Sequence, residues 1–239
     1  KHFLIIEDVS AQNEAGRHKE EWRKMLAHDF RSPLTIMHGV LRSVEDLGVG
    51  HALDESDLEL VGSGVRNARR LDDLIESYLE TTRLEDGAIP LNPAPVDVDR
   101  LIREIVSEEN ADPRSRRLTL SAGAPAGLTA RADPELLRRA LTNLVSNAVK
   151  FTPPGGHIQV SATPRDRAVL ITVADDGPGI SAHDLPHVFD RFYQGESGKK
   201  GHGLGLGLTF CRAALRAMGG EVAVESEDGK GSVFTLRVP

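Results

Sequence analysis

The first third of the chain carries most of its apolar side chains at the spacing of a heptad repeat. Two runs alternate steps of three and four residues, which places one stripe along a helix. The first run is Ala11, Ala15, His18 and Trp22, and the second is Leu26, Phe30, Pro33, Met37, Val40, Val44 and Leu47. Joining the runs takes successive steps of four, which predicts a slip of register beside His28. Pro33 should bend the helix, because proline cannot donate to the helical ladder.

A second helical stripe follows a break at residues 48–51. Its members are Val61, Gly64, Ala68, Leu71, Ile75, Tyr78 and Thr82. Two antiparallel helices bury only one stripe each, whereas two such hairpins together form a four-helix bundle. The pattern therefore predicts a homodimer. Residues 1–9 are typical of a short strand with no sheet to join, and we expect them to be the end of a truncated upstream domain.

A change of composition separates this all-α region from the rest of the chain. Gly87 is followed by Pro90, Pro93 and Pro95, which is typical of a linker. Helical patterns then occur at 98–106, 133–150 and 204–218, and strand patterns at 118–121, 157–163, 168–174, 221–226 and 231–238. Elements in this order favour an α+β sandwich with helices on one face of a mixed sheet. The predicted division is an upstream remnant (1–9), a helical hairpin region (10–86), a linker (87–95) and an α+β domain (96–239).

The composition of the chain limits its possible binding partners and its expected cellular compartment. The chain has 239 residues and a net charge of −7, which argues against nucleic acid or anionic lipid as the main partner. No apolar run approaches the ~18 residues of a membrane span. We therefore expect a cytoplasmic fragment, with any membrane attachment in missing upstream segments. The single cysteine, Cys211, fits a reducing compartment and is typical of a small apolar helix residue rather than of a reactive thiol.

Candidate chemistry begins with a polar stripe on the helix predicted at 133–150. Asn143, Asn147 and Lys150 are spaced i, i+4, i+7 and so share one face. Two amides and a lysine suit Mg²⁺ and phosphates, because Mg²⁺ takes one or two protein oxygens and completes its shell with phosphate and water. A solvated polar face explains the stripe equally well.

Two glycine-rich segments follow. Residues 175–179 read Asp-Asp-Gly-Pro-Gly after a predicted strand, either as a plain turn or as a buried carboxylate beside glycines that let a base approach. Glycines also alternate at 201, 203, 205 and 207 before a predicted helix, where free backbone N–H groups can face phosphates. That spacing matches neither the Rossmann nor the P-loop pattern, so neither fold is indicated.

Three histidines are further candidates for chemistry. His28 lies in Met25-Leu26-Ala27-His28-Asp29, upstream of these possible nucleotide segments, and is a candidate nucleophile. His183 and His187 have the spacing of a zinc pair, but Pro186 lies between them and no third ligand is near in the sequence. A zinc site is therefore disfavoured.

Taken together, six segments resemble the bacterial sensor histidine kinases of two-component systems. Residues 25–34 resemble the phosphoacceptor box, 143–151 the asparagine box, 175–180 the first glycine box, 189–192 the phenylalanine box, 201–206 the second glycine box and 229–234 the closing turn and strand. Each segment is weakly specific alone, but the six in this order are highly specific. The resemblance covers the chain from about residue 10 and implies a dimerisation and phosphotransfer hairpin followed by a Bergerat-type ATP-binding domain.

The resemblance also implies roles for individual residues. His28 is the phosphoacceptor, Asp29 orients its imidazole and takes up the proton, and Asn147 ligates Mg²⁺. Asp175 reads the adenine amino group of ATP, and residues 184–201 form a lid. The other residues implied at the nucleotide are Asn143, Lys150, Phe151, Gly177, Gly179, Ile180, Phe192, Tyr193, Lys199, Lys200, Gly201, His202, Gly203, Leu204, Gly205 and Leu206.

Two positions depart from the family pattern. Gln194 follows Phe192-Tyr193 where the family often has arginine, so a cation for the γ-phosphate must come from Arg191, Lys199 or Lys200. Ser32 stands where the family usually has threonine or asparagine, which keeps a hydroxyl for phosphatase activity. The expected function is autophosphorylation followed by transfer to a response-regulator receiver domain. The alternatives are a Bergerat ATPase and a degenerate nucleotide-binding scaffold.

Overall fold

The computed structural model describes residues 34–44, 54–111, 115, 117–195 and 205–239. The chain divides into two compact units, Lys1–Glu76 and Ser77–Pro239, here called the hairpin unit and the sheet domain. Helix α2 (Glu55–Glu85) begins in the first unit and ends in the second. Within the described ranges, no helix has both the length and the apolarity needed to cross a membrane.

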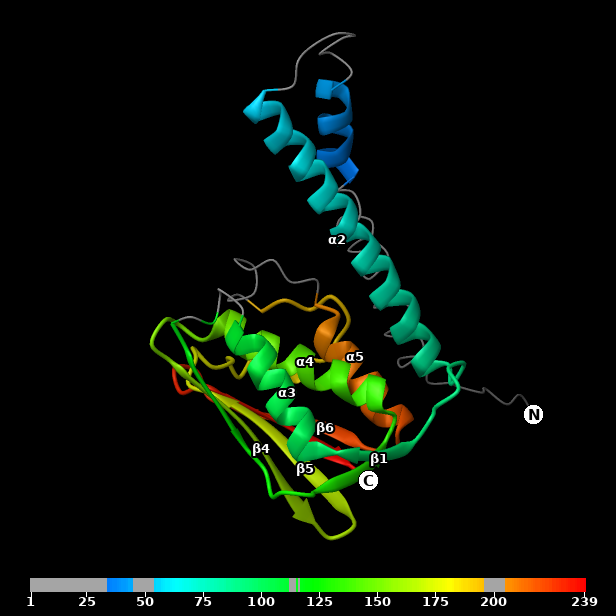
Figure 1. Cartoon of the computed structure of the whole chain (residues 1–239), viewed down its shortest axis with the longest axis vertical. Coiled ribbons are helices and arrows are strands. Elements are labelled where there is room, and N and C mark those ends of the chain that lie inside the picture. Colours follow the sequence, from blue (N-terminus) through cyan, green and yellow to red (C-terminus); the bar gives the residue numbers. More distant parts are fainter. Residues whose placement is uncertain (1–33, 45–53, 112–114, 116, 196–204) are drawn as a thin grey trace, which may run out of the picture. The chain divides into compact units, whose positions relative to one another are not determined.

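The described part of the hairpin unit consists of two helical segments that lie side by side (Figure 1). Residues 34–44 form the first segment, and α2 begins with a reciprocal cap. The N–H of Asp54 donates to Asp57 Oδ2 at 3.0 Å, and the N–H of Asp57 donates to Asp54 Oδ1 at 2.9 Å. A Cβ added at Gly64 would lie 3.0 Å from Cγ1 of the buried Val40. The two predicted seams therefore meet at this pair.

The sheet domain contains a five-stranded sheet and a two-stranded one. The large sheet has the order β2-β4-β5-β7-β6, in which only β2 and β4 pair in parallel. Its strands are β2 (Thr119–Gly123), β4 (His157–Arg165), β5 (Ala168–Asp175), β6 (Glu221–Ser226) and β7 (Ser232–Val238). Strands β1 (Ala94–Asp97) and β3 (Thr129–Ala132) form the small antiparallel sheet.

Three helices cover one face of the large sheet: α3 (Val98–Ala111), α4 (Pro134–Phe151) and α5 (Gly207–Ala217) (Figure 1). A short 3₁₀ turn, η2 (Leu185–His187), lies between β5 and α5 in the chain. The core between the helices and the sheet is fully buried at Ile102, Leu141, Ile171 and Leu236. The α+β sandwich with helices on one face of a mixed sheet is therefore confirmed.

Local signals explain why α4 begins where it does. Asp133 accepts hydrogen bonds from the N–H groups of Glu135 and Leu136, at 3.1 and 3.2 Å, and Pro134 occupies the first helical turn. Eight apolar residues from Leu136 to Val149 are buried on one stripe. The helix predicted at 133–150 is therefore confirmed.

Two features differ from the expected elements. Strands β1 and β3 were not anticipated, and β1 takes in Ala94 and Pro95 at the end of the predicted linker. Pro95 is tolerated because this strand pairs only with β3 and lies at a sheet edge. Helix α5 begins at Gly207 rather than near residue 204.

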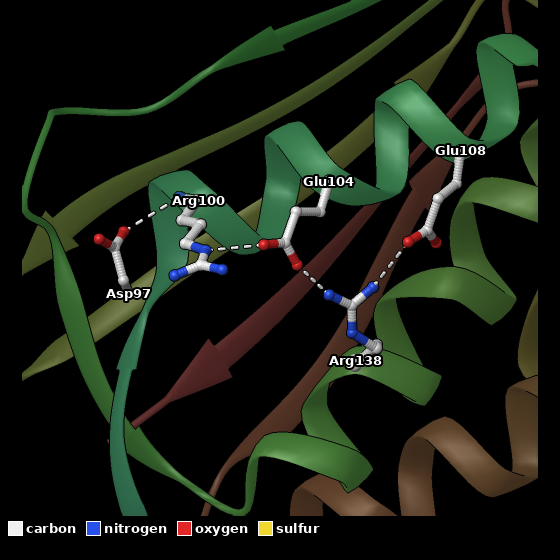
Figure 2. A network of polar contacts seen from close by, with 5 residues as sticks. All are labelled: Asp97, Arg100, Glu104, Glu108 and Arg138. Carbon is white, nitrogen blue, oxygen red and sulfur yellow. Dashed lines mark hydrogen bonds and ion pairs between the residues drawn. The ribbon is translucent and has the colours of Figure 1, made fainter.

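A chain of charged contacts joins α3 to α4 at the surface (Figure 2). The Nε of Arg100 donates to Glu104 at 2.7 Å, and Arg138 of α4 pairs with Glu104 and with Glu108 of α3. The hydrogen bond from Arg100 is the main cause that lowers the pKa of Glu104. Because these groups are solvated, the network should contribute little to stability.

Candidate functional site

The site begins with Asp175, the last residue of β5, whose side chain is partly buried. The N–H of Gly177 donates to its Oδ1 at 3.0 Å. Burial raises the pKa of Asp175, backbone hydrogen bonds from Gly177 and Ser232 oppose that shift, and the charge of Asp176 adds to it. A half-buried carboxylate with free acceptor capacity can bind an amino group of a ligand.

The adjacent Asp176 is turned to solvent instead. Its Oδ1 accepts from the N–H of His157 at 2.7 Å, and its Oδ2 lies 3.0 Å from Nδ1 of the same histidine. The backbone hydrogen bond from His157 is the main cause that lowers the pKa of Asp176. Asp175 is therefore the carboxylate available inside the fold. The partnership with His157 was not anticipated from the sequence, because it depends on the position of β4 beside β5.

The glycines after Asp175 occupy positions without room for a side chain. A Cβ at Gly177 would lie 2.7 Å from Asp175 Oδ1 and 3.5 Å from the carbonyl oxygen of Phe151. Gly179 has a φ of +70°, and a Cβ there would lie 2.1 Å from the carbonyl oxygen of Glu227. The N–H of Ile180 donates to Ser226 Oγ at 2.8 Å. The segment is therefore a tightly packed wall against the β6–β7 turn and not a plain solvent-exposed turn.

The polar stripe of α4 lies close to the same region. Asn143 and Asn147 are partly buried, whereas Lys150 is exposed with its Nζ 4.6 Å from the centre of the Phe151 ring. A Cβ at Gly207, the first residue of α5, would lie 3.6 Å from Cγ of Asn143. At the C-terminal end of α4, the carbonyl oxygen of Phe151 would lie 3.5 Å from a Cβ added at Gly177. The two amides are therefore partly covered rather than fully solvated.

The phenylalanine segment and the second glycine segment are joined. The N–H of Phe192 donates to the carbonyl oxygen of Gly205 at 2.9 Å, and a Cβ at Gly205 would lie 2.5 Å from the carbonyl carbon of Phe192. Phe192 is buried at a φ of 62°, a strained conformation for an aromatic residue. Tyr193 donates its hydroxyl to Asp184 Oδ1 at 2.6 Å, and Leu206 is buried. These contacts bring residues 184, 192–193 and 205–206 together.

Several predicted site residues lie outside the described residues. They are His28, Asp29, Ser32, Lys199, Lys200, Gly201, His202, Gly203 and Leu204. Among the predicted residues that the structure describes, Asp175, Gly177 and Phe151 lie together near the end of α4, and Phe192 and Tyr193 lie beside Gly205 and Leu206 at the start of α5. Asn143 lies beside Gly207, and Gly179 and Ile180 contact the β6–β7 region.

Contacts with the last turns of α2 were not anticipated. Arg191 forms an ion pair with Glu85, and its Nη1 lies 3.4 Å from Thr82 Oγ1. Arg139 of α4 forms an ion pair with Glu80 and lies over the ring of Phe210 at 4.3 Å. The Arg191 cation is therefore engaged by α2 in this arrangement. No short motif could have indicated these pairs, because their partners are separated by 59 and 106 positions in the chain.

The position of Cys211 agrees with its interpretation as a small apolar helix residue. Cys211 is fully buried, and burial raises its pKa to about 12, so its thiol stays protonated. His187 lies 3.0 Å from Asp190, but among the described residues no three His, Cys, Asp or Glu side chains are grouped as metal ligands.

Comparison with known proteins matches both units to families. Residues 18–87 match the His Kinase A (phospho-acceptor) domain, and residues 132–239 match the Histidine kinase-, DNA gyrase B-, and HSP90-like ATPase family. The signal transduction histidine-protein kinase AfsQ2 of Streptomyces coelicolor is 35% identical over 98% of this chain and 44% of its own length. The adaptive-response sensory kinase SasA of a Synechococcus species is 31% identical over 99% of this chain and 63% of its own length.

Solved structures agree with this assignment. Full-length ShkA in complex with AMPPNP is 31% identical, with a TM-score of 0.69 over 92% of this chain and 45% of that one. The histidine kinase AdeS of Acinetobacter baumannii shares the fold, with 23% identity and a TM-score of 0.70 over 88% of this chain and 96% of that one. The chain thus spans 44% and 63% of the lengths of the two curated relatives. Its two matched modules, in this order, place it in the family of two-component sensor histidine kinases, of which it comprises the catalytic core.

Proposed function

We propose that the chain is a protein-histidine kinase, which phosphorylates itself on His28 with ATP and passes the phosphoryl group to an aspartate of a response-regulator receiver domain. The observation that carries the proposal is the geometry at Asp175. The half-buried carboxylate of Asp175 lies beside Gly177, where there is no room for a side chain. A Cβ added at Gly177 would lie 3.5 Å from the carbonyl oxygen of Phe151, at the end of the helix that bears Asn143 and Asn147. This arrangement supports the proposal that Asp175 and the polar stripe of α4 serve one nucleotide site.

In this proposal Asp175 accepts a hydrogen bond from the adenine amino group. Adenine carries an amino group where guanine carries a carbonyl, so an ionised carboxylate favours ATP over GTP. Gly177, Gly179 and Ile180 shape the base pocket, and Phe192 and Tyr193 belong to the lid. The residues assigned to the phosphate side are Asn143, Lys150, Lys199, Lys200, Gly201, His202, Gly203, Leu204, Gly205 and Leu206.

The donor set fits Mg²⁺ as a companion of ATP. The carboxamide oxygen of Asn147 is a hard ligand on a partly covered face, and Mg²⁺ commonly takes one or two protein oxygens. The metal would neutralise charge that develops on the transferred phosphoryl group. In this proposal Asn143, one turn earlier on α4, and Lys150, about one turn later, contact phosphate oxygens.

The acceptor chemistry follows from a neutral imidazole. A ring nitrogen of His28 attacks the γ-phosphorus, an N–P bond forms, the bond to the bridging oxygen breaks and ADP leaves. Asp29 holds the reactive tautomer and takes up the proton from the other ring nitrogen. The phosphoramidate then passes its phosphoryl group to the receiver carboxylate. The hydroxyl of Ser32 is a candidate to position the water that hydrolyses the phosphoaspartate of the receiver domain, which would release inorganic phosphate.

A homodimer is part of the proposal, because the hairpin unit leaves large apolar side chains uncovered. Leu41 and Leu58 are 65% and 59% exposed, and a second hairpin would cover such side chains in a four-helix bundle. The receiver domain is expected to dock on the same unit. Thr35, His38 and Arg42 are exposed on the helix of residues 34–44, and residues 58–66 of α2 are the second part of the expected docking surface.

The test is incubation with γ-labelled ATP and Mg²⁺. We expect label on the protein that survives alkali and is lost in acid, and no label on His28→Gln. Asp175→Asn should reduce discrimination between ATP and GTP. Release of labelled phosphate without protein labelling would favour an ATPase, and nucleotide binding with neither outcome would favour a scaffold. Persistent labelling of His28→Gln would remove His28 as the acceptor.

A further inference from the structure

A hollow of about 530 Å³ lies between the last turn of α2, the segment that follows it and α5. Its walls include Leu84, Ile89, Leu91, Arg212, Ala213 and Arg216. All of these residues belong to the sheet domain, and none is among the residues assigned to the nucleotide. The volume falls within the range of about 300–1,000 Å³ that is usual for small-molecule sites.

One side of the hollow is apolar and fixed. Leu84 is only 4% exposed and belongs to the core of the sheet domain. Ile89 and Leu91 are partly buried and pack against the same core, and Ala213 is buried in α5. A ligand that covers these side chains would remove apolar surface from water without disturbing the core.

The lining that α5 contributes also carries two cations. Arg212 and Arg216 lie one turn apart on α5, so their side chains share a face. Arg212 approaches Asp190 at 3.8 Å, which is too long for a hydrogen-bonded pair. Arg216 is exposed, and no carboxylate among the described residues forms an ion pair with it. The acidic wall residue Glu85 is engaged by Arg191. Within the described part of the chain, the hollow therefore combines a guanidinium that has no ion-pair partner with an apolar surface.

We propose that this hollow binds an amphipathic organic anion. Its carboxylate would pair with Arg216, with Arg212 close by, and its apolar body would lie on Leu84, Ile89 and Leu91. A guanidinium favours a planar carboxylate head, because it can donate two parallel hydrogen bonds. The bound molecule would contact both the end of α2 and α5, so occupancy would stabilise the packing of these elements.

The test uses decanoate, a ten-carbon carboxylate, titrated calorimetrically into the whole chain. Acetate supplies the head group alone, and 1-decanol supplies the apolar body alone. We expect decanoate to bind, and acetate and 1-decanol to bind at least tenfold more weakly. Arg216→Glu should weaken decanoate binding at least tenfold. The matched control is Arg167→Glu, an exposed arginine in the β4–β5 turn, which should leave the affinity unchanged.

Location is checked independently by methyl NMR. The signals of Ile89 and Leu91 should shift on addition of decanoate, whereas Ile158, which pairs with Asp175 across the sheet, should not. Ala217 also lines the hollow. Ala217→Trp would fill the hollow with both arginines retained and should abolish binding, with circular dichroism as the check on folding. Saturation with AMPPNP should leave the decanoate affinity unchanged.

Three results would overturn the proposal. The first is no detectable heat with decanoate in the parent chain. The second is equal affinity for the parent and Arg216→Glu. The third is displacement of decanoate by AMPPNP or shifts confined to the surroundings of Ile158, because either would locate the anion in the nucleotide site. These outcomes do not depend on phosphotransfer, so the proposed kinase activity stands or falls separately.

Discussion

The hairpin unit and the sheet domain differ in how far their large apolar side chains are buried. In the sheet domain, Ile102 and Leu236 are 0% exposed, and in the hairpin unit Leu41 and Leu58 are more than half exposed. Full burial of one leucine contributes about 1.5–3 kcal/mol. The sheet domain therefore closes a core of its own, whereas the described part of the hairpin unit leaves large apolar side chains exposed. If the proposed homodimer covers them, the stability of the hairpin unit should depend on protein concentration and that of the sheet domain should not.

The largest expected effect comes from opening the closed core. Leu141 of α4 is fully buried, and Leu141→Ala should lower the free energy of unfolding of the sheet domain by about 2–5 kcal/mol, because it removes apolar contacts and leaves a cavity. Urea denaturation followed by far-UV circular dichroism measures the change. Leu41→Ala is the matched control and should leave the sheet-domain transition where it was. Equal shifts for the two variants would contradict the contrast between the units.

The exposed leucines should matter for association instead. Leu41→Asp combined with Leu58→Asp should raise the dissociation constant of the dimer at least a hundredfold, since two side chains that a partner would bury become charged. Light scattering coupled to size exclusion over a range of concentrations measures it. The sheet-domain unfolding transition should not move. If the parent chain is monomeric at every concentration, or if the double variant dimerises like the parent, the exposed leucines do not form the dimer interface.

Glycines provide the same contrast on a smaller scale. A Cβ at Gly179 would collide with the carbonyl of Glu227 at a φ of +70°, so Gly179→Ala should cost about 1–3 kcal/mol and weaken nucleotide binding. Gly39, on the helix of residues 34–44, has nothing within 4 Å of an added Cβ. Gly39→Ala should therefore stabilise that helix by about 0.5–1 kcal/mol. Thermal unfolding and calorimetric titration with AMPPNP separate the two outcomes, and a neutral Gly179→Ala would show that the wall can relax.

The difference between local and long-range contacts explains how much of the structure could be predicted from the sequence. Helix α4 could be predicted because its N-cap, its proline and its apolar stripe are all local. Strands β1 and β3 could not, because each has four residues, β1 contains Pro95, and the pairing joins segments that are far apart in the chain. At the site, the sequence indicated Asp175 and the glycines. The contacts of Arg191 with Glu85 and of His157 with Asp176 depend on tertiary packing and leave no local pattern.

The smallest expected effect compares Asp175 and Asp176, adjacent residues with opposite environments. Burial raises the pKa of Asp175, and the hydrogen bond from the backbone of His157 lowers that of Asp176. We expect the side-chain carboxyl carbon of Asp175 to titrate at higher pH than that of Asp176 in a ¹³C NMR titration of the ligand-free chain. The raised pKa of Asp175 gives stability that is full below its unfolded value and is lost as pH rises through its folded value. Asp176 gives stability that is present above its unfolded value and is lost as pH falls through its folded value. Asp176→Asn should remove only the loss of stability that occurs as pH falls through the folded pKa of Asp176. A reversed order of titration would mean that Asp176 is the carboxylate inside the fold and that adenine recognition is misassigned.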